Sequence, residues 1–330
     1  MDFSIIIPVY NRPFELDELL KSISKQKRDV DFEVIVVEDG SEVKSEMIVK
    51  DYAVFLNIKY FYKENTGPGD SRNFGVKESS GEYLIFLDSD CILPNDYLQE
   101  VSLALKNNFT DGFGGADKAH DSFTDWEKAI SYSMTSFLTT GGIRGSEKAR
   151  NKFQLRSFNL GISKKAFLKI KGFSKQRFGE DIDLTFRLWK SKCTTQFLSK
   201  AFVYHKRRAT WRQFSRQTFN FGAARPVLDK MYPASSKMVF WFPSFFIIGL
   251  FFGILGLWFD SHVLPIIYAS YFLAIYVDSL ISSKNPIVAL LSIFTTMTQF
   301  LGYGSGFIRS AFRIKILKRT PEAAFPKMFQ

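Results

Sequence analysis

The chain has 330 residues, a formal net charge of +11 and 46% hydrophobic residues. This length allows two domains or one large one. The positive charge alone would suit a nucleic-acid partner, but Lys and Arg are scattered among acids except at residues 206–208 and 309–319. Both basic clusters lie near long apolar runs, so anionic lipid headgroups explain them better, and we expect no nucleic-acid partner.

The cysteine content and the first residues indicate the compartment. Cys91 and Cys193 are the only cysteines, and they lie far apart without a metal-ligand spacing. This usage suits a reducing compartment. Residues 1–4 contain no basic segment and lead directly into an apolar run, so we expect no signal peptide. The soluble part of the chain is therefore expected in the cytoplasm.

The first 90 residues alternate between strand and helix patterns. Residues 3–9 form an apolar run typical of a buried strand, and residues 12–26 carry apolar side chains on one helical face. The alternation continues with strands at 32–37, 57–62 and 83–87 and with helices at 43–52 and 68–79. Such repetition predicts an α/β fold, with a mostly parallel sheet flanked by helices on both faces.

The chain changes character after residue 90. A helix is expected at 94–107, a glycine-rich segment at 112–115 and another helix near 126–138. Residues 158–162 and 195–198 are predicted as short strands of a second half-sheet, which would supply the pocket of a second substrate. The glycine- and charge-rich residues 141–150 offer little to bury, so we expect a mobile loop there.

Two acids follow the strand at 83–87. Asp88 and Asp90 would project beyond the carboxyl end of that strand, where open α/β sheets collect their ligands. Carboxylates at i and i+2 can hold a hard cation such as Mg²⁺ or Mn²⁺, which stabilises a diphosphate as a leaving group. The alternative is an Asp-rich turn that caps the helix beginning near Pro94.

Polar residues also follow the second and third strands. Asp39, next to Glu38, could accept a hydrogen bond from the imide N–H of a uracil base, although Asp-Gly-Ser is also ordinary turn sequence. The turn through Asn65 and Gly67 opens a helix with Arg72 one turn in, which suits a nucleotide phosphate or ribose. The chain has no Walker lysine loop and no G-x-G-x-x-G, so neither a P-loop NTPase nor a dinucleotide enzyme is supported.

A third acidic cluster opens a later helix. Gly179 precedes Glu180 and Asp181, and the glycine permits a close approach to a ligand. The two acids could bind an acceptor hydroxyl and remove its proton, on the face opposite a leaving diphosphate. The alternative is that these acids, with Asp183, only cap the helix.

These motifs, in this order, resemble a family 2 glycosyltransferase with the Rossmann-like GT-A fold. The resemblance covers about residues 4–228 and rests on the segments 4–11, 38–41, 65–67, 72–73, 88–90, 179–181 and 204–205. An ordered set is far more specific than any one of its motifs. The resemblance implies an inverting enzyme that uses a nucleotide-diphosphate sugar and a divalent metal, Mg²⁺ or Mn²⁺.

The resemblance also assigns roles by position. Asp181 would be the general base, with Glu180 beside it. Asp90 and Asp88 would bind the metal and the diphosphate, with Asp88 nearer the ribose, and His205 would be a further metal or phosphate ligand. A lone histidine is as often structural, so this last role stays open. The implied donor-binding residues are Pro8, Tyr10, Asn11, Asp39, Asn65, Gly67, Arg72 and Asp88.

The chain departs from the family pattern in two places. Glu38 stands where the family commonly has a second aspartate, a change that keeps the charge. Processive members carry Gln-x-x-Arg-Trp, whereas here Gln213 and Arg216 are followed by Gln217. The missing tryptophan points to addition of a single sugar rather than polymer extrusion.

Two other functions stay open. A nucleotidyltransferase shares the α/β layout but usually has a glycine-rich basic loop after its first strand, which residues 10–13 do not offer. A non-catalytic membrane scaffold or glycan-binding protein with a decayed transferase domain is the second alternative. The intact acids at positions 88, 90, 180 and 181 speak against such decay.

Three apolar runs, at 239–259, 263–281 and 287–308, occupy the last third of the chain. Each is about the ~20 residues that a helix needs to cross a bilayer. Lys284, the basic tail and the N-terminal domain would all prefer the cytoplasmic side, which three full spans do not allow. One run is therefore expected to be interfacial or re-entrant, and the first and the third are the candidates. Asp278 is expected at the level of the headgroups.

The predicted organisation is a GT-A catalytic domain at 1–232, with a nucleotide-sugar half at 1–115 and an acceptor half at 116–232. A membrane-associated region with two or three apolar helices and a basic tail follows at 233–330. We expect a cell-membrane protein whose catalytic domain faces the cytoplasm. Its partners would be a nucleotide-diphosphate sugar, with uridine favoured by the resemblance only, membrane lipid, and a lipid-linked or other glycan acceptor in cell-surface glycan or polysaccharide biosynthesis.

Overall fold

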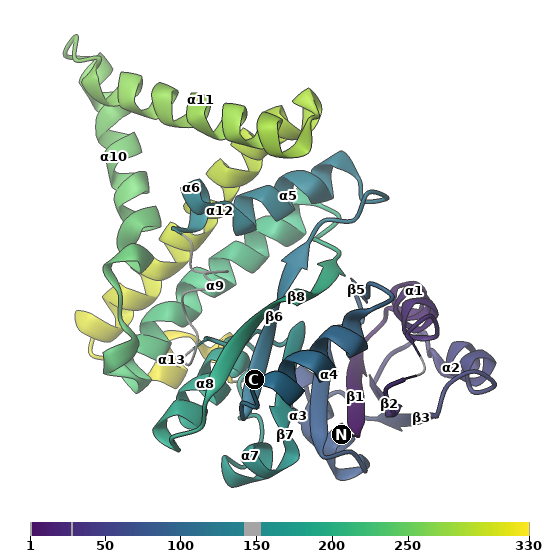
Figure 1. The fold of residues 1–330 in the computed structure, drawn as a ribbon. Coiled ribbons are helices and arrows are strands. Elements are labelled where there is room, and N and C mark those ends of the chain that lie inside the picture. Colours follow the sequence, from purple (N-terminus) through teal and green to yellow (C-terminus); the bar gives the residue numbers. More distant parts are fainter. Residues whose placement is uncertain (1, 28, 142–152, 330) are drawn as a thin grey trace. The chain divides into compact units, whose positions relative to one another are not determined.

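The computed structural model describes residues 2–27, 29–141 and 153–329. The chain forms two compact units (Figure 1). The first, which we call the sheet unit, comprises Met1–His120 and Gly145–Lys206. The second, the helical unit, comprises Asp121–Arg144 and Arg207–Gln330.

The first half of the sheet is parallel, as the βα alternation predicts. Its strands are β1 (Phe3–Val9), β2 (Phe32–Asp39), β3 (Ile58–Lys63) and β4 (Tyr83–Leu87). β1 pairs with both β2 and β4, and β2 pairs with β3, all in parallel register. The carboxyl ends of these four strands therefore meet at one edge of the sheet.

The remaining strands continue the same sheet, and the strands predicted at 158–162 and 195–198 lie in its second half. β7 (Asn159–Ser163) pairs antiparallel with β4 along the whole length of that strand. β6 (Gly112–Lys118), β8 (Thr195–His205) and β5 (Cys91–Ile92) follow, giving the order β3-β2-β1-β4-β7-β6-β8-β5. Apolar runs identify strands but not their pairing partners, so the order of these strands comes from the structure alone.

Helices cover both faces of the sheet because alternate residues of the central strands point to opposite sides. Ile5 and Ile7 of β1 belong to one buried cluster, with α1 (Pro13–Ile23) and α4 (Tyr97–Asn107) packed on it. Ile6 belongs to the other cluster. The helices that contribute to that second cluster are α3 (Pro68–Lys77), α7 (Lys164–Lys169) and α8 (Glu180–Lys190). α2 (Glu46–Tyr52) lies between β2 and β3 in the chain and completes the helices of the first half.

Several element bounds differ from the sequence prediction. β8 runs to His205, well beyond the predicted end at residue 198. The short elements β5 and α7 were not predicted, since two to six residues carry no readable periodicity. The helix predicted near 126–138 is two helices, α5 (Asp125–Thr135) and α6 (Phe137–Thr140), separated at Ser136, whose backbone is extended. Apart from Gly141, the predicted mobile loop at 141–150 lies outside the described residues.

The helical unit contains α5, α6, α9 (Trp211–Met231), α10 (Phe242–Leu257), α11 (Val263–Ser283), α12 (Pro286–Lys315) and the short α13 (Pro321–Ala324). α5 and α9 fall within residues 1–232, yet they pack with the C-terminal apolar helices. Within the described residues, three helical stretches are long and apolar enough to cross a membrane: Met238–Leu257, Val263–Ser283 and Pro286–Lys315. The third predicted apolar run thus continues as helix into the basic tail.

Candidate active site

The predicted site residues gather where the parallel strands end. Asp39 ends β2, Asn65 and Gly67 follow β3, and Asp88 and Asp90 follow β4. The parallel register carries all of these chain segments to one edge of the sheet. α3 and α8 begin at this edge and bring Arg72 and Glu180 to it.

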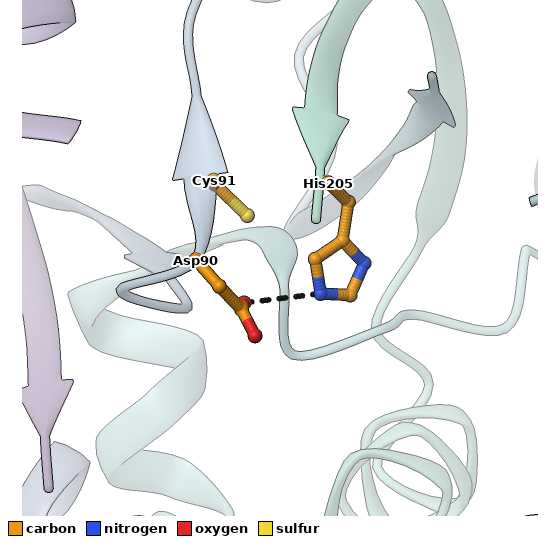
Figure 2. Close-up of side chains that lie close together, drawn as sticks. All are labelled: Asp90, Cys91 and His205. Atoms are coloured by element: carbon orange, nitrogen blue, oxygen red, sulfur yellow. Dashed lines mark ion pairs between the residues drawn. The ribbon is translucent and has the colours of Figure 1, made fainter. Parts of the chain in front are cut away.

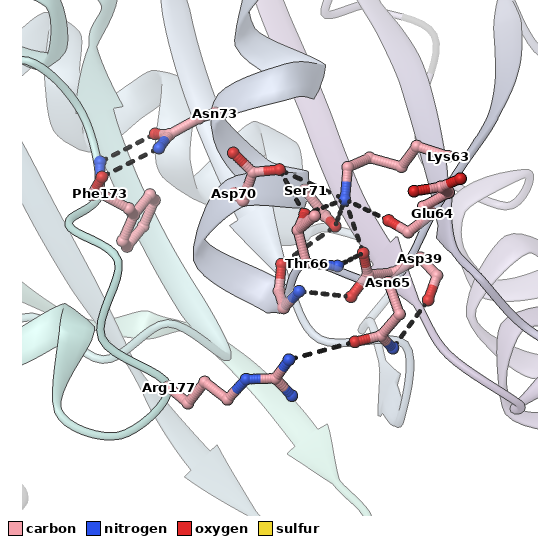
Figure 3. A network of polar contacts seen from close by, with 11 residues as sticks. Asp39, Lys63, Glu64, Asn65, Thr66, Asp70, Ser71, Asn73, Phe173 and Arg177 are labelled. Atoms are coloured by element: carbon pink, nitrogen blue, oxygen red, sulfur yellow. Dashed lines mark hydrogen bonds and ion pairs between the residues drawn. The ribbon is translucent and has the colours of Figure 1, made fainter. Parts of the chain in front are cut away.

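Asp39 is held by a closed network of hydrogen bonds (Figure 3). Its Oδ1 accepts from the ammonium of Lys63 at 2.7 Å and from the backbone N–H of Thr66 at 3.0 Å. Its Oδ2 accepts from the backbone N–H of Gly67 at 2.9 Å. A carboxylate offers about four lone-pair positions, so these contacts leave room for one more donor, such as a base N–H.

The turn at Gly67 explains how the backbone reaches Asp39. Gly67 has φ +99, a conformation that side-chain-bearing residues rarely adopt, and its side-chain-free Cα faces the guanidinium stem of Arg177. Asn65 donates to the carbonyl oxygen of Asp39 at 2.9 Å and accepts from Arg177 at 3.3 Å. The loop between β3 and α3 is therefore tied to both the strand end before it and the chain after residue 173.

The residues that follow β1 connect to the turn after β2. Asn11 adopts a left-handed conformation, φ 52, and its side-chain oxygen accepts from the backbone N–H of Glu42 at 2.8 Å. Its own N–H donates to the hydroxyl of Ser41 at 2.7 Å. Pro8 lies within β1, and Tyr10 is 52% exposed at its end. In this arrangement Asn11 shapes the turn, whereas Tyr10 presents an open aromatic face.

Glu38, the acid that replaces the family's second aspartate, faces away from solvent. Its carboxylate accepts from the backbone N–H of Ser45 at 2.8 Å and from the hydroxyl of Tyr60 at 3.4 Å. The hydroxyl of Ser41 donates to its other oxygen. Glu38 therefore stabilises the turn after β2, which explains why the longer side chain is accommodated.

Arg72 joins two acidic motifs that lie far apart in the sequence. Its guanidinium is buried and donates to Asp88 at 2.6 Å and to Glu180 at 3.2 Å. Its guanidinium also lies over the ring of Phe173, 5.3 Å from the ring centroid. A planar, always-charged group can bridge two carboxylates at fixed geometry. The motif after β4 and the motif at the start of α8 are therefore parts of one charged site.

Asp90 lies beside His205, as the resemblance implies for a metal site (Figure 2). β5 pairs antiparallel with β8, with Cys91 opposite His205 in the register. The imidazole Nε2 is 3.1 Å from Asp90 Oδ1, and the guanidinium of Arg12 pairs with the other oxygen. The ring of His205 stacks on Phe158, with centroids 4.8 Å apart, which fixes its orientation.

The donor set at this point fits a divalent cation. Ligand atoms of Asp90, Cys91 and His205 all lie within 4.8 Å of one another. Burial and the neighbouring acids raise the pKa of the Cys91 thiol well above its ordinary value, and the thiol donates to the carbonyl of Phe158. Thiolate ligands suit softer metals than Mg²⁺ or Mn²⁺. The carboxylate and the imidazole are therefore the groups suited to hold an ion.

Glu180 and Asp181 differ in their surroundings although they are adjacent. Burial raises the pKa of Glu180 above its ordinary value, and the negative charge of Asp181 raises it further, whereas Arg72 opposes both. Asp181 is only partly buried and accepts from the backbone N–H groups of Ser157 at 3.3 Å and Ile182 at 2.8 Å. Asp181 is thus the more accessible carboxylate, while Glu180 holds Arg72.

Sequence reasoning missed three cations of this site. Arg12 pairs with Asp90, Lys63 with Asp39, and Arg177 with Asn65. Arg12 and Lys63 follow or end predicted strands, a signal that could have indicated them. Arg177 lies in an irregular segment, and no pattern in the sequence marks it.

The match to known families covers the part of the chain that builds the parallel strands. A sequence model of glycosyl transferase family 2 matches residues 4–170, about half of the chain. The chain belongs to this family. The family 2 assignment therefore confirms the resemblance inferred from the ordered motifs.

Proteins similar to this family 2 glycosyltransferase cover it to different extents. A Campylobacter jejuni protein, GalNAc(5)-diNAcBac-PP-undecaprenol beta-1,3-glucosyltransferase, is 27% identical over 67% of this chain and 68% of its own length. An uncharacterized glycosyltransferase of Rickettsia bellii is 40% identical over 32% of this chain. The Staphylococcus aureus poly(ribitol-phosphate) beta-N-acetylglucosaminyltransferase TarS is 36% identical over 34% of it. The matches span only 15% and 20% of the Rickettsia and Staphylococcus proteins.

Solved structures share the fold over most of the chain. The Pyrobaculum calidifontis mannosyltransferase PcManGT, in complex with GDP-Man and Mn²⁺, gives a TM-score of 0.60 at 15% identity, covering 93% of this chain and 86% of its own. Residues 1–349 of S. aureus TarS give 0.51 at 21% identity, covering 96% and 92%. These likenesses concern the fold alone, and they confirm the predicted GT-A fold.

Proposed function

We propose that this chain is an inverting glycosyltransferase that moves a sugar from a UDP-sugar to a hydroxyl of a lipid-linked acceptor. The observation that carries the proposal is the buried Arg72, which contacts Asp88 on the donor side and Glu180 on the acceptor side. In this proposal the Arg72 guanidinium sets the distance between the nucleotide diphosphate leaving group, near Asp88, and the base, next to Glu180. Such positioning is a large part of what an enzyme contributes to a displacement reaction.

Asp181 is the general base of the proposed reaction. It takes the proton of the acceptor hydroxyl, whose oxygen attacks the anomeric carbon while the bond to the nucleotide diphosphate breaks on the opposite face. The configuration at that carbon inverts in a single displacement. Glu180, held by Arg72, positions the start of α8 so that Asp181 keeps its exposure.

The nucleotide half of the proposed site is formed by the ends of β1 to β4. The remaining acceptor position on Asp39 suits the imide N–H of uracil. Tyr10 and Asp88 are exposed enough to contact the base and the ribose. TarS has been solved with UDP-GlcNAc, which supports a uridine donor, although PcManGT binds GDP-Man.

Asp90 and His205 would hold Mn²⁺ or Mg²⁺, with Asp88 nearby. When bound there, the ion supplies positive charge to the diphosphate leaving group. An imidazole ligand favours Mn²⁺ over Mg²⁺, which prefers oxygen ligands. The Mn²⁺ present in the PcManGT complex agrees with this choice. Arg12 would leave Asp90 when the ion arrives, since both compete for the same carboxylate.

The relatives and the apolar helices support the proposed acceptor and location. The Campylobacter relative is named for a glycan on undecaprenol diphosphate, and this supports a lipid-linked acceptor here. We place the catalytic domain, residues 1–232, in the cytoplasm at the cell membrane, with residues 233–330 as its membrane-associated region. The nucleotide-sugar half is residues 1–115 and the acceptor half residues 116–232.

The test is Asp181→Asn in the full chain, with release of nucleotide diphosphate measured across a panel of nucleotide sugars and lipid-linked acceptors. The variant should lose transfer by at least about a thousand-fold while donor affinity changes little, because the base acts only on the acceptor. Asp31→Asn, an exposed carboxylate before the start of β2, is the matched control and should leave transfer unchanged. Retained turnover in Asp181→Asn contradicts the base assignment. If the wild type instead releases inorganic diphosphate from a nucleoside triphosphate and a sugar 1-phosphate, and no nucleotide diphosphate from nucleotide sugars, it is a nucleotidyltransferase.

A further inference from the structure

α12 packs so closely on α9 that backbone atoms of the two helices are in contact, which leaves no space for lipid between them. Three glycines make this possible: Gly302 and Gly306 on α12, and Gly222 on α9. A Cβ added to Gly222 would lie 1.9 Å from the carbonyl oxygen of Tyr303, and one added to Gly306 would lie 2.2 Å from that of Phe219. We call this contact the glycine seam. Small residues at such a seam fix two helices as one element.

α9 carries too many charged residues for a helix in the hydrocarbon core of a bilayer. It carries four cationic and one anionic residue: Arg212, Arg216, Arg225, Asp229 and Lys230. Arg225 and Asp229 form an ion pair at 2.7 Å, while Arg212 and Arg216 have no such partner on the helix. Each charge placed at a bilayer centre costs about 3 kcal/mol on insertion scales. The glycine seam therefore ties α12 to a charged helix, which is costly to place in hydrocarbon.

α5 adds the same constraint at the other end of α12. The hydroxyl of Thr295 donates to the carbonyl of Ala129 at 3.0 Å. Asn285, which caps the start of α12, donates to Asp125 at 3.1 Å. α5 itself begins with acids and a lysine, Asp125, Glu127 and Lys128. α12 is thus flanked by charged helices along most of its length, and crossing the bilayer would carry both of them into lipid.

α10 and α11 have the opposite character. α10 contains no charged residue and α11 contains only Asp278. In their most apolar windows 22% and 11% of residues are buried within the protein, against 44% for α12. They contact each other where the hydroxyl of Tyr268 donates to the carbonyl of Phe246 at 2.6 Å and where Gly253 meets Leu264. Both also contact α12, where Gly304 meets Pro243 of α10 and the hydroxyls of Ser279 and Ser292 lie 2.8 Å apart. Their remaining faces expose large apolar side chains such as Phe251 and Leu273.

Polar groups mark both ends of the α10–α11 pair. Asp278 accepts from the hydroxyls of Tyr132 at 2.5 Å and Ser136 at 3.1 Å, which ties the end of α11 to α5 and α6. Lys284 follows α11 directly. At the far end the connection turns through residues 258–262, whose last three are Asp, Ser and His. The helical stretches of 20 and 21 residues each span ~30 Å, the thickness of a hydrocarbon core.

We propose that α10 and α11 cross the bilayer as a pair, whereas α12 stays at the cytoplasmic surface with α9. Two crossings return the chain to its starting side, so Lys284 and the basic tail both lie in the cytoplasm, where cationic segments are favoured. The exposed apolar stripe of α12, which includes Phe294, Leu301 and Phe312, then rests in the interface. The first and the third apolar runs were the candidates for an interfacial segment, and the structure favours the third, residues 287–308. This topology is independent of the proposed transfer reaction.

The experiment uses single cysteines in the full chain and a membrane-impermeant maleimide. Cys91 and Cys193 are buried and give little background. Ser261→Cys marks the connection between α10 and α11, and Lys318→Cys marks the tail. In right-side-out vesicles Ser261→Cys should label at least ten-fold more than Lys318→Cys, and inverted vesicles should reverse this ratio. Both variants lie outside the proposed site, so unchanged nucleotide diphosphate release controls for folding.

Two results would overturn the proposal. Labelling of Lys318→Cys in right-side-out vesicles means that α12 crosses the membrane. Labelling of Ser261→Cys only after detergent, or only in inverted vesicles, means that α10 and α11 do not cross it. Neither result bears on Asp181→Asn, so failure of the topology and failure of the proposed function are distinguishable.

Discussion

The carboxylates at the ends of β2 and β4 are held in two different ways. Asp39 at the end of β2 accepts from two backbone N–H groups, which the fold fixes in place, and from the ammonium of Lys63. Asp88 and Asp90 after β4 are paired with the side chains of Arg72 and Arg12, and Asp90 with that of His205. Backbone donors cannot leave, and the buried Arg72 is held by Glu180 as well, whereas the partly exposed Arg12 can rotate away from Asp90. The β2 end is therefore a rigid shape, and at the β4 end the pairing of Asp90 with Arg12 is exchangeable.

The largest expected effect is at the exchangeable end. Asp90→Asn keeps the shape of the side chain but removes the charge that would hold the cation, so transfer should fall by about a thousand-fold or more. Thermal stability should change little, because the side chains of Arg12 and His205 are partly exposed and water can replace their contact with Asp90. Nucleotide diphosphate release with titrated Mn²⁺ measures the first quantity and a melting curve the second. Asp96→Asn, exposed before α4, is the matched control. Activity within ten-fold of wild type would refute the metal assignment.

A smaller effect is expected at the rigid end, and it should appear in stability as well as binding. Asp39→Asn replaces one acceptor oxygen by an NH₂ donor. This donor would face another donor, on Lys63, Thr66 or Gly67, and no hydrogen bond can form between them. We expect a loss of about 2 kcal/mol in the free energy of unfolding and weaker UDP binding. Urea unfolding and calorimetry with UDP measure the two effects. Glu42→Gln, which changes an exposed residue of the same turn, should alter neither quantity. If Asp39→Asn leaves the free energy of unfolding unchanged, the backbone N–H groups do not make the end of β2 more rigid than the end of β4.

The smallest effect concerns a backbone-held carboxylate at the start of β2. Burial opposes ionisation of Glu33, but hydrogen bonds from Ser80, Ser4 and Lys59 lower its pKa to about 2. A lowered folded-state pKa stabilises the protein above the unfolded pKa, and this contribution is lost as the pH falls from about 4.5 toward 2. Glu33→Gln should cost about 1–2 kcal/mol at pH 7 and progressively less below pH 4.5.

The measurement for Glu33 is urea unfolding at several pH values. Glu78→Gln, an exposed carboxylate before β4, is the matched control and should show no such pH dependence. UDP binding should be unchanged in both variants, since Glu33 lies at the end of the sheet opposite the site. A Glu33→Gln stability loss that grows toward acid would show that the carboxylate is not stabilising the fold when ionised.

The parallel half of the fold could be predicted because each of its strands has a recognisable local sequence pattern. The five apolar residues of β4 and the apolar residues of β1 and β2 read directly as buried strands, and the acids after them follow from strand direction. β5, by contrast, is two residues long, and only its pairing with β8 brings Asp90 next to His205. A sequence carries no periodic signal for a strand of that length.

The roles of individual polar residues were harder to predict than their neighbourhood. The sequence placed Asp39 at a strand end but not the N–H groups of Thr66 and Gly67, which reach it only because Gly67 has a positive φ. Arg12 follows a strand and pairs with Asp90, a contact set by the order of strands in the sheet. Long-range ion pairs depend on topology, and local patterns do not contain it. The roles assigned to the site residues stay predictions until the variants are measured.

The pairing of β5 with β8 also has a consequence for how the protein is made. Asp90 leaves the ribosome long before His205, and the family-matched residues 4–170 end before both Asp181 and β8 have appeared. The parallel strands β1 to β4 can pair with one another while synthesis continues, because all four precede residue 90. A nascent chain therefore acquires its nucleotide-facing edge first, and its proposed base and second ligand only when more than half of the protein has been translated.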